Sequence, residues 1–160
     1  MAIHQNCHLI AVIGGKGGVG KSVFAANLAF ATMFEMRAKT LLIDADPQSC
    51  GDQNFITGLR PNKTLKDLVN YKGSISQQTL NSLVTQHSSG LSYIGAVQSP
   101  DESFEVSPDI LRQQLGAISQ FFKYIIVDLG NEAGSLQLGL IEDSSAVTLV
   151  TTPEVLVVNQ

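Results

Sequence analysis

Short apolar runs recur along the chain and alternate with segments whose apolar residues follow a helical period. Runs that are apolar throughout are typical of strands buried on both faces of a sheet, whereas apolar spacings of three and four residues indicate a helix. The pattern predicts strands at residues 8–14, 40–44, 91–97, 124–127 and 146–151. It predicts helices at 22–36, 64–69, 75–86 and 135–141, a further helix that begins near 107, and loops at 46–58 and 98–106.

Two of the predicted helices show how they begin or which side they bury. Segment 22–36 is apolar nearly all round, so we expect it to be enclosed on more than one side. The later helix has Ser107 as its N-cap, Pro108 at its first position and an acid, Asp109, in its first turn. Its apolar stripe consists of Ile110, Leu111, Leu115, Ile118 and Phe122.

Strands and helices that alternate from end to end predict an α/β fold. In such folds the strands form a mainly parallel sheet with helices on both faces, which gives three layers, α/β/α. Crossovers between the strands are right-handed, and ligands bind at the carboxyl ends of the strands. A length of 160 residues fits one domain.

The composition excludes several classes of protein. Hydrophobic residues make up 44% of the chain and charged residues 15%, which does not fit a disordered protein. The net charge is −4 and Lys and Arg do not cluster, so we do not expect DNA binding. Cys7 and Cys50 lie far apart, as expected of reduced thiols in a cytoplasmic protein. We expect no signal peptide, and the longest apolar stretch, 23–34, is too short to cross a bilayer.

A phosphate-binding loop is indicated between the first predicted strand and the first predicted helix. The segment is Gly15-Lys16-Gly17-Gly18-Val19-Gly20-Lys21-Ser22, which fits G-x-x-x-x-G-K-[ST]. Glycines let successive N–H groups turn toward a polyphosphate, and the following helix points the positive end of its dipole at the same charge. Lys21 is expected between the β- and γ-phosphates, and the Ser22 hydroxyl on Mg²⁺. The alternative, a glycine-rich turn without a ligand, leaves the full pattern unexplained.

A second lysine, Lys16, stands at the second position of this loop. The sequence KGGVGKS resembles the deviant Walker A box of the ParA/MinD family of ATPases. The resemblance implies an enzyme that binds ATP, hydrolyses it slowly and forms a homodimer when ATP is bound. It also implies that Lys16 crosses the dimer interface, touches the phosphates bound by the partner subunit and is catalytic together with Lys21. The alternative is that Lys16 is a solvated loop charge.

Two acids follow the second predicted strand, in the segment Asp44-Ala45-Asp46-Pro47-Gln48. A carboxylate at such a strand end can hold a metal-bound water or the attacking water near a γ-phosphate. The segment also resembles switch I of the ParA/MinD family. That resemblance implies that Asp46 positions the attacking water and belongs to the Mg²⁺ shell, with Asp44 behind it. An ordinary Asp-Pro turn is the alternative.

A third acid, Asp128, ends the apolar run at 124–127, which is the form of a Walker B strand. Its carboxylate is expected to reach Mg²⁺ through water. The chain departs here from the ParA/MinD pattern, in which a proline often follows two residues after this acid, because it has Leu129-Gly130-Asn131-Glu132. The departure bears on the conformation of this loop and on the hydrolysis rate. The segment Thr151-Thr152-Pro153-Glu154 also resembles the family, where it lies beside the nucleotide at the dimer face.

The resemblance covers nearly the whole chain and is specific at residues 14–28, 40–48 and 123–128. Family members usually continue beyond the T-x-P-E segment. The 160 residues are therefore expected to be the N-terminal part of a single P-loop ATPase domain whose C-terminal part is missing. Segments 51–59 and 64–68 most resemble the branch near CpaE/TadZ and MinD, which positions pilus or secretion machinery at a cell pole.

Several functions are compatible with these motifs. The preferred one is an ATP-gated dimeric switch, with ATP and Mg²⁺ as cofactors, that positions cellular machinery from the cytoplasm, at a pole or at the inner membrane face. Its protein partner is not identified, and membrane contact is expected only through residues beyond Gln160. Alternatives are a plasmid or chromosome partition ATPase that binds DNA nonspecifically, and a nucleotide-dependent scaffold with little turnover. A reductase resembling the nitrogenase iron protein is excluded because neither Cys7 nor Cys50 lies where its cluster cysteines would be.

Overall fold

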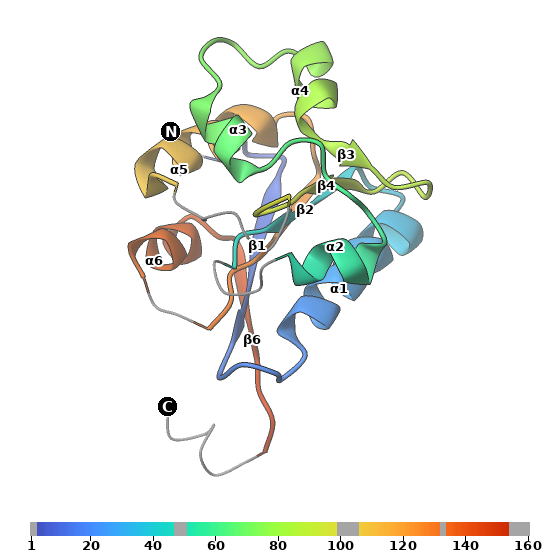
Figure 1. The fold of residues 1–160 in the computed structure, drawn as a ribbon, viewed down its shortest axis with the longest axis vertical. Coiled ribbons are helices and arrows are strands. Elements are labelled where there is room, and N and C mark those ends of the chain that lie inside the picture. The colour runs from blue at the N-terminus through green and yellow to red at the C-terminus, as the bar shows by residue number, and fades with distance from the viewer. Residues whose placement is uncertain (1–2, 47–50, 99–105, 132–133, 154–160) are drawn as a thin grey trace.

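The computed structural model describes residues 3–46, 51–98, 106–131 and 134–153. Figure 1 shows a central sheet with helices on both faces, which confirms the predicted three-layer α/β fold. The strands of the described residues run in the order β3-β4-β2-β5-β1-β6. Only the β3–β4 pair is antiparallel within these ranges. The strands are β1 (His8–Gly14), β2 (Thr40–Asp44), β3 (Thr85–Gln86), β4 (Ser92–Ile94), β5 (Tyr124–Asp128) and β6 (Ala146–Val150).

The helices pack on the two faces of the sheet over separate apolar clusters (Figure 1). They are α1 (Lys21–Met36), α2 (Asp52–Thr57), α3 (Leu65–Asn70), α4 (Gln77–Leu83), α5 (Pro108–Ser119) and α6 (Ser135–Glu142). The alanines of α1 pack on one face of the central strands, and leucines and isoleucines of α3 to α6 pack on the other. Apolar side chains cover both faces of β1, β2 and β5, which accounts for the apolar residues in the middle of these strands.

Helix α1 packs on the sheet and is also contacted by α2, whose Gln53 binds the Ser22 carbonyl oxygen, but several of its large residues stay exposed, so it is less enclosed than predicted. Its buried apolar residues are the small ones, Ala25, Ala26 and Ala29, which let the helix approach the strands closely. Larger residues such as Leu28 are partly buried against the same cluster, whereas Phe34 remains 59% exposed. An all-round apolar composition therefore marks a close-packed small-residue face and not a central position.

Three other local predictions need correction. Segment 52–57 forms a helix, α2, where a loop was expected; Gly51 and Gly58, both with positive φ, flank it. The helix predicted at 75–86 is shorter, because residues after Leu83 leave it and form β3 against β4. Ile110 is 42% exposed and does not belong to the buried stripe of α5.

The start of α5 was predicted correctly, with Ser107 as N-cap and Pro108 in the first turn, although the Ser107 side chain makes no capping hydrogen bond. Strand β4 is shorter than predicted, and Gly95 just after it forms a bridge with Thr64. None of the helices in the described part of the chain has the length and apolar character that a bilayer span requires.

Candidate functional site

The loops that carry the predicted site residues meet at one edge of the sheet. Strand β5 lies between β1 and β2, so the ends of all three are neighbours. Asp44 is directly opposite Asp128 in the β2–β5 register, and Val12 is opposite Asp128 in the β1–β5 register. The structure thus brings the glycine-rich loop, the acids after β2 and the acid that ends β5 together at the carboxyl edge of the sheet.

The glycine-rich loop is fixed at its base and open at its rim. Gly14 N donates to Gly130 O at 2.9 Å, and Gly15 N donates to Val150 O at 3.0 Å. Gly18 and Gly20 have φ of 80° and 91°, a left-handed conformation that favours glycine. A methyl group at either glycine would meet nothing within 4 Å. A hollow of about 400 Å³ beside the rim is lined by Gly18, Gly20, Lys21, Ser22, Val23, Asp52, Phe55 and Ile56.

Helix α1 begins at this loop with its first N–H groups available to a ligand. Gly20 is its N-cap and supplies no side chain, and the first turn holds no acidic residue. The first backbone N–H groups of a helix have no partner within the helix, and the dipole adds partial positive charge there. The start of α1 therefore suits an anion such as a phosphate group.

Lys21 is buried and ion-paired within the site. Its aliphatic chain runs over the end of β1, where a methyl group on Gly14 would lie 3.0 Å from Lys21 Cδ. Its Nζ lies 2.7 Å from Asp46 Oδ2, with side-chain exposures of 11% and 3%. Burial by itself lowers the pKa of Lys21, but Asp46 and, less closely, Asp128 and Asp52 outweigh it and leave that pKa above its usual value. Lys21 is therefore charged at neutral pH.

Asp46 is packed between Lys21 and the loop after β5. Its backbone N–H donates to Asp44 Oδ1 at 3.2 Å, and Asp44 itself is fully buried behind it. Gly130 has φ of 78°, and a methyl group there would lie 2.6 Å from Asp46 Cγ and Oδ1. Any side chain at position 130 would occupy the space that this carboxylate fills.

Asp128 is fully buried and has a partner that the sequence analysis did not identify, Gln53 of α2. Gln53 Nε2 donates to Asp128 Oδ2 at 2.9 Å and to the Ser22 carbonyl oxygen at 2.8 Å. Burial raises the pKa of Asp128, and the nearby Ser22, Gln53 and Lys21 side chains offset part of that rise. The sequence did contain one indication of α2, the helix that carries Gln53. The glycines on either side of it mark the two ends of a short helix within the segment expected to be a loop.

The oxygen atoms at this point fit a magnesium ion held together with phosphate. Within the described part of the chain, Asp128 Oδ1 and Gln53 Oε1 are buried and accept no hydrogen bond. Buried acceptors without donors are rare, and a hard cation with its waters would satisfy both. The described residues contain no group of three or more His, Cys, Asp or Glu side chains that could hold a metal alone. Mg²⁺ commonly binds through few carboxylates plus phosphates and water.

The remaining predicted positions lie at the rim or outside the described residues. Lys16 is partly exposed at the glycine-rich loop. Thr151 and Pro153 are exposed beyond β6, and the buried Thr152 hydroxyl has no hydrogen-bond partner among the described residues. The segments that contain Pro47 and Gln48, Glu132, and Glu154 lie outside the described residues.

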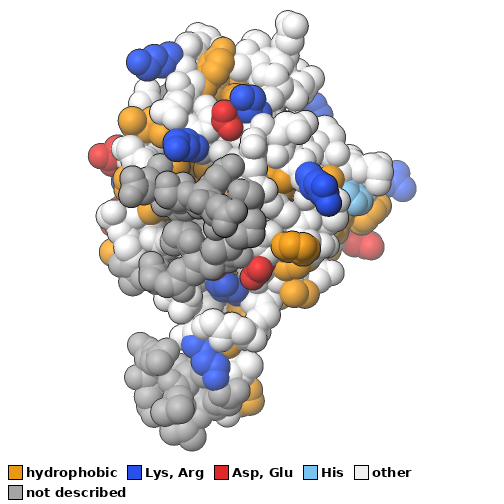
Figure 2. All heavy atoms as spheres, viewed as in Figure 1, with side chains coloured by type: hydrophobic (Ala, Val, Ile, Leu, Met, Phe, Trp, Pro, Cys, Tyr) orange, Lys and Arg blue, Asp and Glu red, His pale blue; other side chains and the backbone are white. Residues whose placement is uncertain are grey.

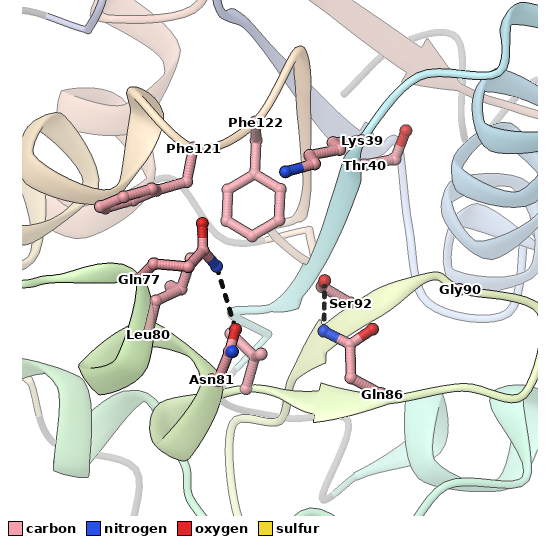
Figure 3. A pocket seen from close by; sticks show the side chains of 11 residues that line it. Lys39, Thr40, Gln77, Leu80, Asn81, Gln86, Gly90, Ser92, Phe121 and Phe122 are labelled. Atoms are coloured by element: carbon pink, nitrogen blue, oxygen red, sulfur yellow. Dashed lines mark hydrogen bonds between the residues drawn. The ribbon is translucent and has the colours of Figure 1, made fainter.

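A second hollow, of about 150 Å³, lies at the opposite edge of the sheet (Figure 3). The Phe122 ring points in among the other lining side chains, and two pairs of the polar side chains bind each other. Gln77 Nε2 donates to Asn81 Oδ1 at 3.0 Å, and Gln86 Nε2 donates to Ser92 Oγ at 2.9 Å. This hollow lacks the glycine loop that lines the first, and the buried carboxylates Asp46 and Asp128 lie at the carboxyl edge, so that edge is the candidate site.

Three comparisons with known proteins bear on the site. A family model described as an AAA domain, AAA_31, matches residues 7–159. The flagellum site-determining protein YlxH of Helicobacter pylori is 31% identical over 160 residues, and the antiactivator FleN of Pseudomonas aeruginosa is 28% identical over 149 residues. These alignments cover 93% and 91% of this chain but 49% and 51% of those proteins, so the chain spans about half the length of the curated relatives it matches. Among solved structures, a ParA family ATPase from Chlorobium tepidum superposes with a TM-score of 0.80 at 27% identity, over 95% of this chain and 63% of that one.

Proposed function

We propose that this chain, which belongs to the AAA_31 family of ParA/MinD-type P-loop ATPases, binds ATP with Mg²⁺ and hydrolyses it slowly as an ATP-gated dimeric switch. The observation that carries the proposal is the meeting of Lys21, Asp46 and Asp128 beside an open glycine loop at one sheet edge. We also propose that the 160 residues form the N-terminal part of a single ATPase domain.

In this proposal the groups of the site bind the phosphates, the metal ion or the attacking water. The N–H groups of Gly15 to Ser22 bind the phosphates, and Lys21 leaves Asp46 to contact the β- and γ-phosphates. The Ser22 hydroxyl would ligate Mg²⁺ and Asp128 would hold it through water, and the bound ion would neutralise phosphate charge. Asp46, once parted from Lys21, orients the attacking water and contacts the metal shell, and Asp44 holds the Asp46 backbone in place.

Lys16 provides the link between nucleotide and dimer. Lys21 already occupies the position next to the phosphates of its own subunit, beside Asp46. Lys16 lies at the partly exposed rim, from which a long flexible cation can reach a phosphate on a facing subunit. Two such sites face to face would neutralise each other's polyphosphates, so the homodimer would form with ATP and separate after hydrolysis. The contact would be strongest as charge develops during phosphoryl transfer.

The two lysines are separated by one set of measurements on the complete protein. Lys21→Ala should abolish Mg-ATP binding in a fluorescent-nucleotide titration, because the phosphates lose their main cation. Lys16→Ala should bind nucleotide almost normally but lose both ATP-dependent dimerisation in sedimentation and phosphate release. Lys39→Ala, at the opposite edge of the sheet, is the matched control and should behave like the parent. A Lys16→Ala protein that dimerises and turns over like the parent would reduce Lys16 to a surface charge.

For the biological role we propose a positioning function like those named for its relatives. The similarity to a flagellum site-determining protein supports a role in determining where a surface structure is built. The resemblance of segments 51–59 and 64–68 to the CpaE/TadZ branch favours pilus or secretion machinery as that structure. The protein would act in the cytoplasm and be recruited to a pole or to the inner membrane face. A fluorescent fusion should gather at a pole in parent cells and spread through the cytoplasm with Lys16→Ala. Uniform fluorescence in both would contradict the positioning role without touching ATP binding.

Two other functions are tested by the same proteins. A partition ATPase would need a basic surface that binds DNA. On the face shown in Figure 2, the Lys and Arg side chains of the described residues are spread apart, and the net charge of the chain is −4. A salt-dependent shift of DNA in a gel would favour partition. A low-turnover scaffold is supported by the packing of Asp46 against both Lys21 and Gly130. ATP binding and dimerisation without phosphate release would favour the scaffold.

A further inference from the structure

Gln53 is a fully buried polar side chain to which the proposed function assigns no task. It projects from α2 to two other elements at once. One N–H of its amide donates to the Ser22 carbonyl oxygen in the first turn of α1, and the other donates to Asp128 Oδ2 at the end of β5. Both amide hydrogens are therefore used within the site.

These two bonds fix the relation between the groups proposed to hold the metal. Ser22 and Asp128 belong to different elements, and a side chain that binds both sets the spacing between them. The bond to Oδ2 also fixes the rotation of the carboxylate and leaves Oδ1 for another ligand. Groups that orient the ligands of a metal in this way commonly decide how tightly it binds.

The unsatisfied atoms lie on the same two side chains. Among the described residues, Gln53 Oε1 and Asp128 Oδ1 are buried and accept no hydrogen bond. An amide oxygen can only accept, so its partner must be a donor such as water. A hydrated cation next to Asp128 would supply that water.

The neighbouring Asn54 has bonds of a different kind, and these attach α2 to the sheet. Its Oδ1 accepts from the buried Tyr93 hydroxyl at 2.7 Å, and its Nδ2 donates to the Val97 carbonyl at 3.4 Å. The helix is thus attached to the β4 side independently of Gln53. Asn54 and Gln53 form a matched pair, with one amide toward the sheet and one toward the site.

We propose that Gln53 is a positioning residue for magnesium, which orients Asp128 and the first turn of α1 toward one metal shell and accepts a hydrogen bond from water through Oε1. The inference rests on the proposed Mg-ATP function and adds to it the residue that arranges the metal ligands. The motifs used in the sequence analysis assign this residue no role, and it lies in a helix that was expected to be a loop.

The test replaces each amide of the pair by an apolar side chain in the complete protein. Gln53→Met keeps the volume and removes both donors, and Asn54→Leu is the control. Mn²⁺ binding to the protein loaded with a non-hydrolysable ATP analogue is followed by electron paramagnetic resonance. Gln53→Met should weaken Mn²⁺ binding about 10-fold or more, as removal of such outer groups does elsewhere. Nucleotide affinity in EDTA should be unchanged, and saturating Mn²⁺ should restore most of the turnover.

Three outcomes separate the inference from the function on which it rests. Parent-like Mn²⁺ affinity in Gln53→Met would overturn the positioning role, and so would an equal loss in Asn54→Leu, because that would mean general loosening of α2. A parent protein that binds no nucleotide would instead refute the proposed function. If Gln53→Met does not fold, Gln53→Asn takes its place with the same expectation, because it keeps an amide too short to reach both acceptors.

Discussion

A single methyl group at position 130 tests how closely the loop after β5 packs against Asp46. Gly130 has φ of 78°, and an added methyl would lie 2.6 Å from the Asp46 Cγ and Oδ1 atoms and 2.9 Å from Oδ2. Carbon atoms in favourable contact are about 3.5–4.0 Å apart. Gly130→Ala therefore forces either the loop or the carboxylate to move.

The expected loss of stability has two parts. A left-handed backbone costs a residue other than glycine about 1–2 kcal/mol. Displacing the carboxylate also breaks its charge-assisted hydrogen bond to Lys21, 2.7 Å long and buried, which is worth about 1.5–3 kcal/mol. Gly130→Ala should thus lower the free energy of unfolding by about 2.5–5 kcal/mol.

Gly58 offers the matched control for the first part. Its φ is 69°, but a methyl group there would meet nothing within 4 Å. Gly58→Ala should therefore cost only the backbone penalty, about 1–2 kcal/mol. Both variants are measured by urea unfolding of the complete protein without nucleotide, and the difference between them isolates the contact with Asp46.

A double-mutant cycle with Asp46→Ala makes the reasoning refutable. Without the carboxylate, the methyl at position 130 has no oxygen to displace, so Gly130→Ala should then cost no more than Gly58→Ala. The expected coupling is about 1.5–3 kcal/mol. An equal cost of Gly130→Ala in both backgrounds would show that this carboxylate does not fill the space beside Gly130.

Two further predictions concern the ion pairs. Asp46→Asn should bind ADP up to about 10-fold more tightly, because Lys21 no longer has to break a charge-assisted hydrogen bond to Asp46 before it contacts the phosphates. Phosphate release should slow in the same variant. Weaker ADP binding in a titration would contradict this. The Arg112 guanidinium lies 2.7 Å from Asp143 Oδ2 and holds the pKa of Asp143 below its usual 3.8. The ion pair therefore stabilises the folded protein above that pH, and this stabilisation is lost as the pH falls through the lower pKa of the folded state. The stability difference between the parent and Asp143→Asn should be constant above about pH 5 and shrink toward zero in acid; a difference independent of pH would exclude the ion pair as its source.

The sequence predicted the parts of the site that follow directly from strand ends. Lys21 follows β1 through the glycine loop, and Asp46 and Asp128 lie at the ends of apolar runs, so each was placed at the carboxyl edge. What the pattern could not give was the order of the strands. That β5 lies between β1 and β2, with Asp44 opposite Asp128, follows from pairings between distant segments. The Lys21–Asp46 ion pair depends on that order.

Helix α2 was missed for a different reason. Sequence periodicity detects helices by an apolar stripe that faces the core. In α2 the large apolar residue Phe55 is 84% exposed, and the buried positions are the polar Gln53 and Thr57. Hydrogen bonds to Asp128, the Ser22 carbonyl and Tyr93 hold the helix in place. A helix whose buried side chains are polar has no apolar stripe, so an analysis of hydrophobic periodicity assigns it as a loop.

The backbone conformation of Gly130 explains why this chain lacks the proline that often stands two residues after the Walker B acid in the ParA/MinD family. Proline fixes φ near −65°, whereas Gly130 has φ of 78°, so a proline cannot adopt the backbone conformation found here. The glycine lets the backbone pass directly against the Asp46 carboxylate, which also binds Lys21. In the proposed mechanism the same carboxylate must leave Lys21 before a nucleotide is held and must then orient water. Changes at position 130 should therefore alter nucleotide affinity and hydrolysis together, through Asp46, although Gly130 itself has no side chain to offer either step.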